Sequence, residues 1–381
     1  MKRPTTYFMQ SPPGPETVIN GDRYIYFGGT SYLGLHAHPE VIDAACDAMQ
    51  KLGLHSASSR ARVGNVQPVV DVERLAAKYF GSEDAFYFVS GYLSIWVILH
   101  ALQDEFDTFI VDSGCHYSIT DAVRCFGKPM FDFSSRDASS LEQKLSSLPA
   151  SSRNPLLISD GVFSADGSLA PVEKYVDVLA RWGGGGILLD DAHGFGVVGA
   201  SGRGTFEQAG MWTSINSESA LGENIVRLYA CGTLSKALGG FGGIVTGSIA
   251  FIHKLKSSTR LFNAASAPPT PVAAASAKSL EILLREPDRL ERLRLNIHRI
   301  KSGLSQMGLD VIESPSAIVG LVTGDDSNMQ NIHERLKQSG IFVPYAASYS
   351  GGGGGFLRIS VFSTHTSEMI DELLSAVALL V

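Results

Sequence analysis

The stretch ILLDDAHGFGVVG, residues 187–199, decides the fold because an aliphatic run ends abruptly in charged residues. Residues 187–189 are apolar, Asp190 and Asp191 follow them, and His193 comes two positions later. A continuous aliphatic run is typical of a strand that is buried on both faces. In sheets of parallel strands, ligands bind beyond the carboxyl ends of the strands. The stretch therefore predicts a ligand at this strand end, although an aspartate that caps the next turn is the ordinary alternative.

Other short apolar segments have the same character, and amphipathic helical stretches separate most of them. They are AFYFV (85–89), TFIVD (108–112), PLLIS (155–159), RLYAC (227–231) and GIVTG (243–247), beside GILLD (186–190) itself. Strands that alternate with helices predict an α/β fold with a mostly parallel sheet covered on both faces.

The two ends of the chain differ from this middle part. Residues 1–22 are rich in proline and glycine and are interpreted as an arm that lies on another surface. Apolar periodicity predicts a helix after Pro39 and a second one over 69–80 that stops at Gly81. A long charged helix over about 275–306 is expected to lead into a smaller domain. That domain has a helix near 328–339, the strand FLRIS and a final helix from about 367.

These patterns divide the chain into three parts. Residues 1–45 form the arm and the first helix, 46–275 a large domain, and 276–381 a small C-terminal domain with helices and strands. Two glycine runs, 183–186 and 351–355, each precede a strand and are interpreted as flexible loops.

Composition excludes several classes of function. The chain has 381 residues, 44% of them hydrophobic, and a formal net charge of −7, which argues against nucleic acid as the main partner. Its four cysteines show no CxxC pair and no metal-ligand spacing, so a reduced, cytoplasmic setting and no metal are expected. The N-terminus has no apolar signal region, and polar residues interrupt the most apolar window, so no membrane span is expected.

A lysine in the stretch ACGTLSKALGGFGG, residues 230–243, adds a second reactive group. Lys236 follows the predicted strand RLYAC and sits among glycines and hydroxyl residues. Such a lysine forms a Schiff base when its surroundings lower its pKa, and Thr233 could donate to a phosphate. A surface lysine in a loop is the common alternative. A strand-end lysine paired with a strand-end aspartate nevertheless matches what pyridoxal phosphate needs, namely an amine for its aldehyde and an acid for its ring nitrogen.

Further strand ends supply the cofactor's remaining needs. Gly91 and Tyr92 begin a helix directly after FYFV, where backbone amides can hold a phosphate. His116 follows TFIVD and could stack on a ring, and Ser164 follows PLLIS. Each has an ordinary alternative: a turn, a core histidine or a capping serine. Their order along successive strand ends predicts a pyridoxal phosphate site.

The chain resembles the α-oxoamine synthases, which are fold type I pyridoxal phosphate transferases, over about residues 25–375. The matching stretches are YLGLHAHPEV, SRARVG, FYFVSGY, DSGCHYS, DGVFSADGSLAP, DDAHGFGVVGASGRGT, GTLSKALGG and FLRISVFSTHT. The resemblance implies the fold of that class, with a mostly parallel sheet in a large domain and a smaller C-terminal α+β domain. It also implies a homodimer with shared active sites.

The resemblance assigns roles to the residues that match the family's motifs. Lys236 would hold the aldehyde and move the α-proton, Asp190 would face the pyridine nitrogen, and His116 would stack on the ring. His193, with Ser164, would contact the phenolic oxygen. The implied phosphate ligands are Gly91, Tyr92, Thr233 and, from the second subunit, Ser266. Arg358 would bind the amino acid carboxylate, and Arg60 matches an arginine near the acyl-substrate entrance.

The implied reaction joins an amino acid to an acyl thioester, on CoA or on a carrier, and yields an α-amino ketone, usually with loss of carbon dioxide. An aminotransferase on the same fold is the first alternative. A partner subunit without chemistry is the second, and the presence of Lys236 argues against it.

Several positions depart from the family pattern. Val69 replaces a histidine, Thr30-Ser31 replaces an asparagine-containing pair, and Ser94-Ile95 replaces Ala-Asn. These changes are expected to cluster at the substrate entrance, so the amino acid and the acyl chain stay open. No role is assigned to Asp191.

Overall fold

The computed structural model describes residues 6–149, 151–216, 225–347 and 355–381. Within them, the largest sheet has the strand order β3-β9-β8-β7-β6-β4-β5. Neighbouring strands from β5 to β8 are parallel, and β9 runs antiparallel to both β8 and β3. The strands are β3 (Asp84–Phe88), β4 (Thr108–Asp112), β5 (Met130–Phe133), β6 (Pro155–Asp160), β7 (Gly185–Asp190), β8 (Val226–Thr233) and β9 (Gly243–Gly247).

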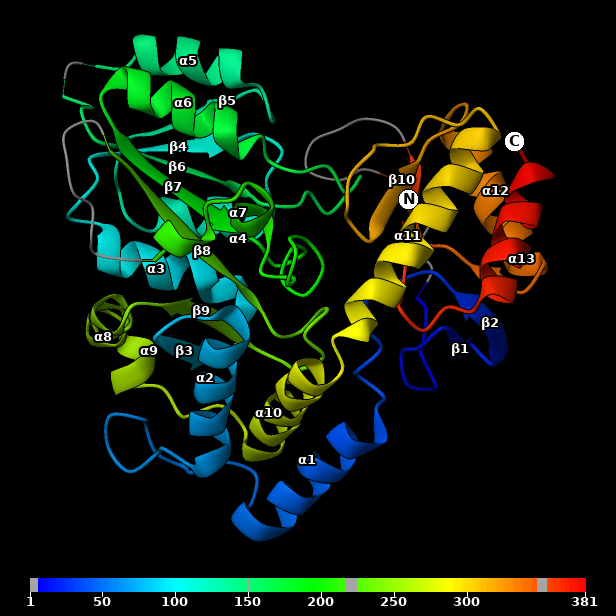
Figure 1. The fold of residues 1–381 in the computed structure, drawn as a ribbon, viewed down its shortest axis with the longest axis horizontal. Coiled ribbons are helices and arrows are strands. Elements are labelled where there is room, and N and C mark those ends of the chain that lie inside the picture. The colour runs from blue at the N-terminus through cyan, green and yellow to red at the C-terminus, as the bar shows by residue number, and fades with distance from the viewer. Residues whose placement is uncertain (1–5, 150, 217–224, 348–354) are drawn as a thin grey trace.

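Successive side chains along these strands point to opposite faces of the sheet and pack into two separate hydrophobic cores. In β7, Leu188 joins one hydrophobic cluster, whereas Ile187 and Leu189 join the other, and all three are fully buried. On one face α3 (Ser94–Leu102) packs against the sheet and against α8 (Ile249–Ser258). On the other face lie α5 (Ala138–Ser146) and α6 (Val172–Trp182), as Figure 1 shows. The predicted α/β fold, with its strands buried on both faces, is confirmed.

All six strands predicted for the large sheet are present, and within that sheet β5 was missed. β5 lies at the edge of the sheet and pairs with β4, and its burial alternates along the strand. Because only part of an edge strand is buried, its sequence MFDF can include an aspartate. It lacks the continuous apolar run that marks a central strand, and for this reason the sequence did not predict it.

A second group of elements lies apart from the large sheet (Figure 1). β10 (Ile318–Leu321), β13 (Phe356–Ser360) and β12 (Tyr345–Ala346) form one small sheet. β1 (Glu16–Ile19), β2 (Asp22–Tyr26) and β11 (Ile341–Phe342) form another. The helices α12 (Asp326–Gln338) and α13 (Ser367–Ala378) belong to the same region. The division of the chain at residues 45 and 275 stays a prediction.

The interpretation of residues 1–22 as an arm is wrong for part of that segment. β1 and β2 form a hairpin, and β2 pairs in parallel with β11 near the C-terminus. Asn20 and Gly21 make the turn with φ values of 53° and 92°. Asn-Gly between alternating apolar residues is a strong hairpin signal, because both positions tolerate positive φ. That signal is present in ETVINGDRYIY.

The single charged helix expected over about 275–306 is instead two helices. α10 (Thr270–Arg285) packs on α1 (Pro39–Leu52) and α2 (Gln67–Phe80), and α11 (Asp288–Gln306) leads into the smaller group of elements. Glu286 between them has φ −122° and ψ 66°. Pro287 follows it, and the residue before a proline is pushed out of the helical region. The local sequence Glu286-Pro287 therefore sets the break between α10 and α11.

The first glycine run is an ordered turn rather than a flexible loop. Gly183 caps α6 in the left-handed region, and Gly185 has φ 138°. A Cβ on Gly185 would lie 2.7 Å from the carbonyl oxygen of Pro155, and one on Gly186 would lie 2.5 Å from the ring of Phe106. Only glycine fits at these positions. In the second run, residues 351–354 lie outside the described residues.

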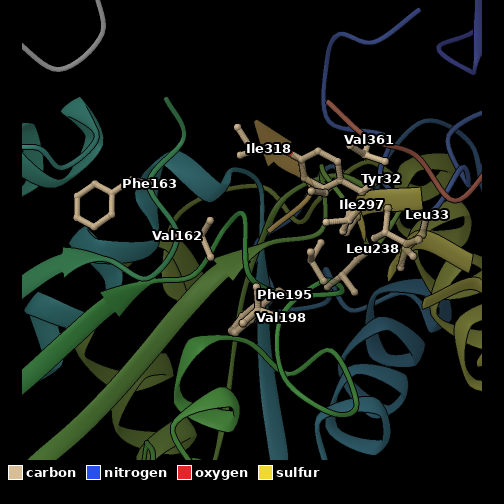
Figure 2. Close-up of a cluster of buried hydrophobic side chains, with 14 of the residues drawn as sticks. Tyr32, Leu33, Val162, Phe163, Phe195, Val198, Leu238, Ile297, Ile318 and Val361 are labelled. Carbon is tan, nitrogen blue, oxygen red and sulfur yellow. The ribbon is translucent and has the colours of Figure 1, made fainter. Parts of the chain in front are cut away.

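Tyr32 lies where the N-terminal segment meets the smaller group of elements. Its ring is fully buried, in the same hydrophobic cluster as Ile297 of α11, Ile318 of β10 and Val361 after β13 (Figure 2). Segments far apart in the sequence thus share one core. Among the described residues, no helix is both long and apolar enough to cross a membrane.

Candidate active site

A cavity of about 370 Å³ opens beyond the carboxyl ends of the parallel strands. Its walls come from the ends of β3, β4, β6, β7 and β8, as expected for a ligand site on a sheet of this kind. The structure brings most of the predicted site residues to this cavity: Gly91, Tyr92, His116, Ser164, Asp190, His193, Thr233 and Lys236. The volume is within the range of small-molecule sites.

Two buried carboxylates and one lysine set the charge of the cavity. Asp160 and Asp190 end neighbouring strands in register with each other. Burial raises the pKa of both carboxyl groups, and for Asp160 the nearby Asp190 raises it further. Burial also lowers the pKa of Lys236 to about 8, although both aspartates oppose that shift. The lysine is therefore partly neutral, and hence nucleophilic, near neutral pH.

Asp190 and Asp191 point to different places because successive side chains alternate along a strand. Asp190 lines the cavity, and one of its oxygens accepts a hydrogen bond from the amide of Ala192, over 3.1 Å. Asp191 is fully buried and accepts hydrogen bonds from the amide and the hydroxyl of Thr205, the latter over 2.9 Å. It thereby holds the loop that carries His193 closed against α7 (Thr205–Gln208). This is the role that sequence reasoning did not find.

His193 is linked to Arg358 through a residue that sequence reasoning missed. The hydroxyl of Tyr32 lies 2.9 Å from Nδ1 of His193, and Nη2 of Arg358 donates to that hydroxyl over 3.1 Å. Arg358 also donates from Nε to the carbonyl oxygen of Ser164, over 2.6 Å. Burial and the nearby cations Lys236 and Arg358 hold the pKa of His193 well below its usual value. Its imidazole is therefore neutral near neutral pH.

His116 is oriented by its own turn. Its amide donates to Asp160 over 3.0 Å, and its Nδ1 lies 2.8 Å from the hydroxyl of Ser118. Burial lowers its pKa. These contacts orient the ring at the wall of the cavity, beyond the end of β4.

The backbone turn after β3 lies very close to the end of β8. Ser90 caps a single 3₁₀ turn over Gly91–Leu93, and its hydroxyl accepts a hydrogen bond from the amide of Tyr92. A Cβ on Gly91 would lie 2.7 Å from the hydroxyl oxygen of Thr233, so only glycine lets the turn reach the end of β8. The turn therefore sets backbone amides beside a hydroxyl, a donor set that suits a phosphate.

These features fit pyridoxal phosphate. A cationic ring nitrogen beside Asp190 would relieve the crowding of two buried carboxylates, and the glycine turn would receive the phosphate. Lys236 supplies a partly neutral amine on the same cavity.

Arg60 and Ser266 are not among the residues of this cavity. The guanidinium of Arg60 is buried and forms a two-point ion pair with Glu73 at 2.6 and 2.9 Å. It also donates to the carbonyl oxygen of Tyr87. Its position near the acyl-substrate entrance stays a prediction. Ser266 pairs with Ser59 in an isolated bridge and lines a separate small hollow beside Arg60. Its contribution to a second subunit stays a prediction.

The departures from the family pattern do not cluster as expected. Thr30 lines the cavity. Val69 and Ile95 are completely buried in the hydrophobic cores, and the hydroxyl of Ser94 donates to the carbonyl oxygen of Gly232. Ser31 is buried, and its hydroxyl contacts His36. The prediction of a changed substrate entrance is therefore wrong for Val69 and Ile95, whose side chains lie inside the hydrophobic cores.

Comparison with known proteins places these observations in a family context. The family described as aminotransferase class I and II matches residues 23–377. The 8-amino-7-oxononanoate synthase of Pseudomonas putida (strain F1) is 34% identical over 371 residues, which cover 97% of this chain and 91% of the relative. Sphingomonas wittichii serine palmitoyltransferase is similar in structure, with a TM-score of 0.87 at 28% identity, covering 100% of this chain and 92% of that one. A serine palmitoyltransferase from S. paucimobilis with a bound PLP adduct has a TM-score of 0.86 at 27% identity, over 98% and 92% of the two chains.

We expect Asp191→Asn to change how stability depends on pH. Burial raises the pKa of Asp191 from 3.8 to about 7. Between these values the folded carboxyl keeps a proton that the unfolded one has lost, so this group's contribution to stability falls as pH rises. The difference in free energy of unfolding between wild type and Asp191→Asn should therefore shrink, by at most about 1.4 kcal/mol per pH unit. Urea unfolding of the apoprotein from about pH 5 to about pH 7 measures it.

The exposed Asp43→Asn, on α1, controls for loss of a carboxylate from the surface. A difference that stays flat or grows with pH would contradict the prediction, because Asp191 would then be ionised already in mild acid.

Proposed function

The chain belongs to the aminotransferase class I and II family and, within it, to the α-oxoamine synthases, and we propose that it joins an amino acid to an acyl thioester. It is a pyridoxal phosphate-dependent acyltransferase, and its product is an α-amino ketone, usually formed with loss of carbon dioxide. The observation that carries the proposal is the meeting of Lys236, Asp190, His193 and His116 at one cavity, with Arg358 hydrogen-bonded to its wall. Relatives named for serine palmitoyl transfer and for 8-amino-7-oxononanoate synthesis support it.

The residues present would hold the cofactor by distinct contacts. Asp190 would face the pyridine nitrogen, and His116 would stack on the ring. His193 and Ser164 would contact the phenolic oxygen, and Lys236 would hold the aldehyde. The amides of Gly91 and Tyr92 and the hydroxyl of Thr233 would contact the phosphate. When bound, the cofactor supplies an electron-accepting ring that stabilises negative charge on the α-carbon of the amino acid.

Lys236 moves the proton on which the reaction depends. Since burial lowers its pKa to about 8, the amine is a base of suitable strength at neutral pH. It takes the proton from the α-carbon. A carbon–carbon bond forms between the α-carbon and the acyl carbon, the carbon–sulfur bond breaks, and the leaving thiolate takes up the proton that Lys236 removed. When the bond between the α-carbon and the carboxylate breaks and carbon dioxide leaves, Lys236, reprotonated from solvent, returns a proton to the α-carbon.

Arg358 recognises the carboxylate of the amino acid. Guanidinium presents donors in a fork that matches a carboxylate. Four of its five N–H groups already donate within the protein, to Ser164, Gly29, Ser360 and Tyr32, which holds the group in place and leaves one Nη2–H for a carboxylate oxygen. Such a held fork binds with little loss of side-chain freedom.

We also propose a cytoplasmic homodimer that uses acyl-CoA. Large exposed side chains lie beside the cavity, including Tyr92, Tyr117 and Phe241, which are 48%, 59% and 56% exposed. Apolar surface of this kind is typical of an interface between subunits. Ser266 would then reach the partner's phosphate site.

The purified, cofactor-loaded protein should release free thiol only when an amino acid and an acyl-CoA are present together. The panel of amino acids is glycine, alanine, serine, threonine and 2-aminobutyrate, each with acyl-CoAs of rising chain length. A thiol reagent and mass spectrometry of the product identify both substrates. Transfer of the amino group to a keto acid without any thioester would instead establish an aminotransferase.

Borohydride reduction of the loaded protein should attach the cofactor to the peptide that contains Lys236. Lys301 is an internal control, because burial lowers its pKa to about 8 as well, and it is not among the residues of the cavity. Amine reactivity alone would label both lysines, whereas cavity geometry selects Lys236. Peptide mass spectrometry distinguishes the two, and labelling of Lys301 in equal yield would contradict the assignment.

Arg358→Lys should raise the KM for the amino acid by roughly tenfold to a hundredfold, because an ammonium cannot keep the internal contacts that hold the guanidinium while it donates to the carboxylate. The KM for the thioester should stay within about a factor of two, since that substrate carries no matching carboxylate. Arg299→Lys is the matched control, because Arg299 makes a two-point contact with Asp371 away from the cavity. An equal rise in both KM values would contradict a carboxylate role.

A further inference from the structure

His36 joins the N-terminal segment to the loop that carries Lys236. Its Nδ1 lies 2.8 Å from the hydroxyl oxygen of Ser31, and its Nε2 lies 3.2 Å from the carbonyl oxygen of Ser235. Ser235 directly precedes Lys236, so this carbonyl belongs to the peptide group that links the two residues. The imidazole therefore contacts the backbone at the lysine itself.

The direction of the contact with Ser235 follows from its acceptor. A backbone carbonyl oxygen carries no hydrogen, so Nε2 of His36 is the donor, whatever other contacts either group makes. In a neutral ring Nδ1 then accepts from the hydroxyl of Ser31. Burial lowers the pKa of His36, which favours that neutral ring. His36 thus donates to the lysine loop while Ser31 orients its ring.

Apolar packing holds the two segments together around this hydrogen bond. Leu33 and Leu238 are fully buried in one hydrophobic cluster, and Figure 2 shows both side chains. A Cβ on Gly239 would lie 2.3 Å from Cβ of Leu35, so only glycine lets the loop approach so closely. Because these neighbours are tightly packed, His36 donates from a fixed position.

The loop has other supports, but they lie further along the chain. Hydroxyl groups of α10 hold the backbone at Gly239 and Phe241, over 2.9 and 3.0 Å. Both contacts come after Lys236, whereas His36 contacts the peptide group directly before it. The lysine is therefore held from both directions along the chain, and His36 holds the nearer side.

We propose that His36 is a positioning residue for Lys236. By holding the carbonyl oxygen of Ser235, it sets the direction in which the lysine side chain leaves the backbone. It thereby keeps the amine inside the cavity that Asp160 and Asp190 also line. This placement is a property of the protein without cofactor, whereas its consequence for proton transfer at the α-carbon rests on the proposed function.

Two substitutions separate the two contacts of His36. Glutamine places an amide nitrogen where Nε2 lies and can still donate to Ser235, whereas the shorter asparagine reaches only toward Ser31. His36→Gln should therefore keep Lys236 in place, and His36→Asn should release it. His253→Asn, at an exposed position of α8, is the matched control for the same change of side chain.

Acetylation of the apoprotein over a range of pH, read by peptide mass spectrometry, reports the pKa of each lysine. Burial lowers the pKa of Lys236 to about 8; Asp190 and Asp160 oppose that shift, and Arg358 adds to it. An amine released into water loses the largest of these effects. His36→Asn should therefore raise the midpoint of acetylation at Lys236 by about one pH unit or more.

Lys301 is the internal control, because burial lowers its pKa to about 8 as well and it is not among the residues of the cavity. Its midpoint should stay unchanged in every variant, and His36→Gln should match wild type at both lysines. An unchanged midpoint at Lys236 in His36→Asn would overturn the proposal. So would an equal shift at Lys301, which indicates general loosening of the fold, or a His36→Gln protein that behaves like His36→Asn.

The tautomer of His36 tests the same contact in wild type. Long-range proton–nitrogen spectra of the ¹⁵N-histidine-labelled apoprotein should show its hydrogen on Nε2, and its signal is the one missing in His36→Gln. A neutral ring with the hydrogen on Nδ1 would overturn the proposal, since it could not donate to Ser235.

In the loaded enzyme, His36→Asn should lose roughly tenfold in kcat, the size expected for one lost hydrogen bond, and His36→Gln should recover it. An unchanged kcat in His36→Asn would contradict a positioning role in proton transfer. If wild type releases no thiol while the acetylation result holds, the proposed function fails and the placement of Lys236 by His36 stands.

Discussion

The burial of two carboxylates at adjacent strand ends is the constraint on which the site depends. Asp160 and Asp190 lie opposite each other in the parallel pairing of β6 and β7, and neither is more than 7% exposed. Two buried negative charges at this position are energetically costly unless a cation lies nearby and compensates them. Lys236 is that cation in the protein, and a protonated ring nitrogen would be a second. The cavity is therefore electrostatically prepared for a cationic aromatic ligand.

Polar contacts inside the core hold the strand ends in place for this purpose. Asp191 closes the loop after β7 onto Thr205, and Arg60 ties the segment before α2 to Glu73. Both pairs are buried, and both partners are satisfied. Removal of one partner would leave a buried polar group unpaired, which costs more than the pair contributes.

The N-terminal segment contributes to the site from the other end of the chain. Tyr32 and the carbonyl oxygen of Gly29 contact Arg358, and His36 lies 3.2 Å from the carbonyl oxygen of Ser235, the neighbour of Lys236. Movement of this segment would therefore shift Arg358 and the loop that carries Lys236 together. In the proposed function, substrate recognition and proton transfer would depend on the same N-terminal segment.

The sequence by itself determined the parallel sheet, the order of the strand ends and most of the residues that meet at the cavity. Aliphatic runs are local, and parallel strands bring their carboxyl ends to one edge, so the amino-acid order alone is enough to group Asp190, His116 and Lys236. The local sequence also specifies the hairpin turn at Asn20-Gly21 and the helix break before Pro287. The separation of Asp190 from Asp191, the ion pair of Arg60 and the bridge made by Tyr32 were decided only by the tertiary structure. Each depends on which distant residue a side chain meets once the strands and the small domain have packed, and nothing in the neighbouring sequence specifies that partner.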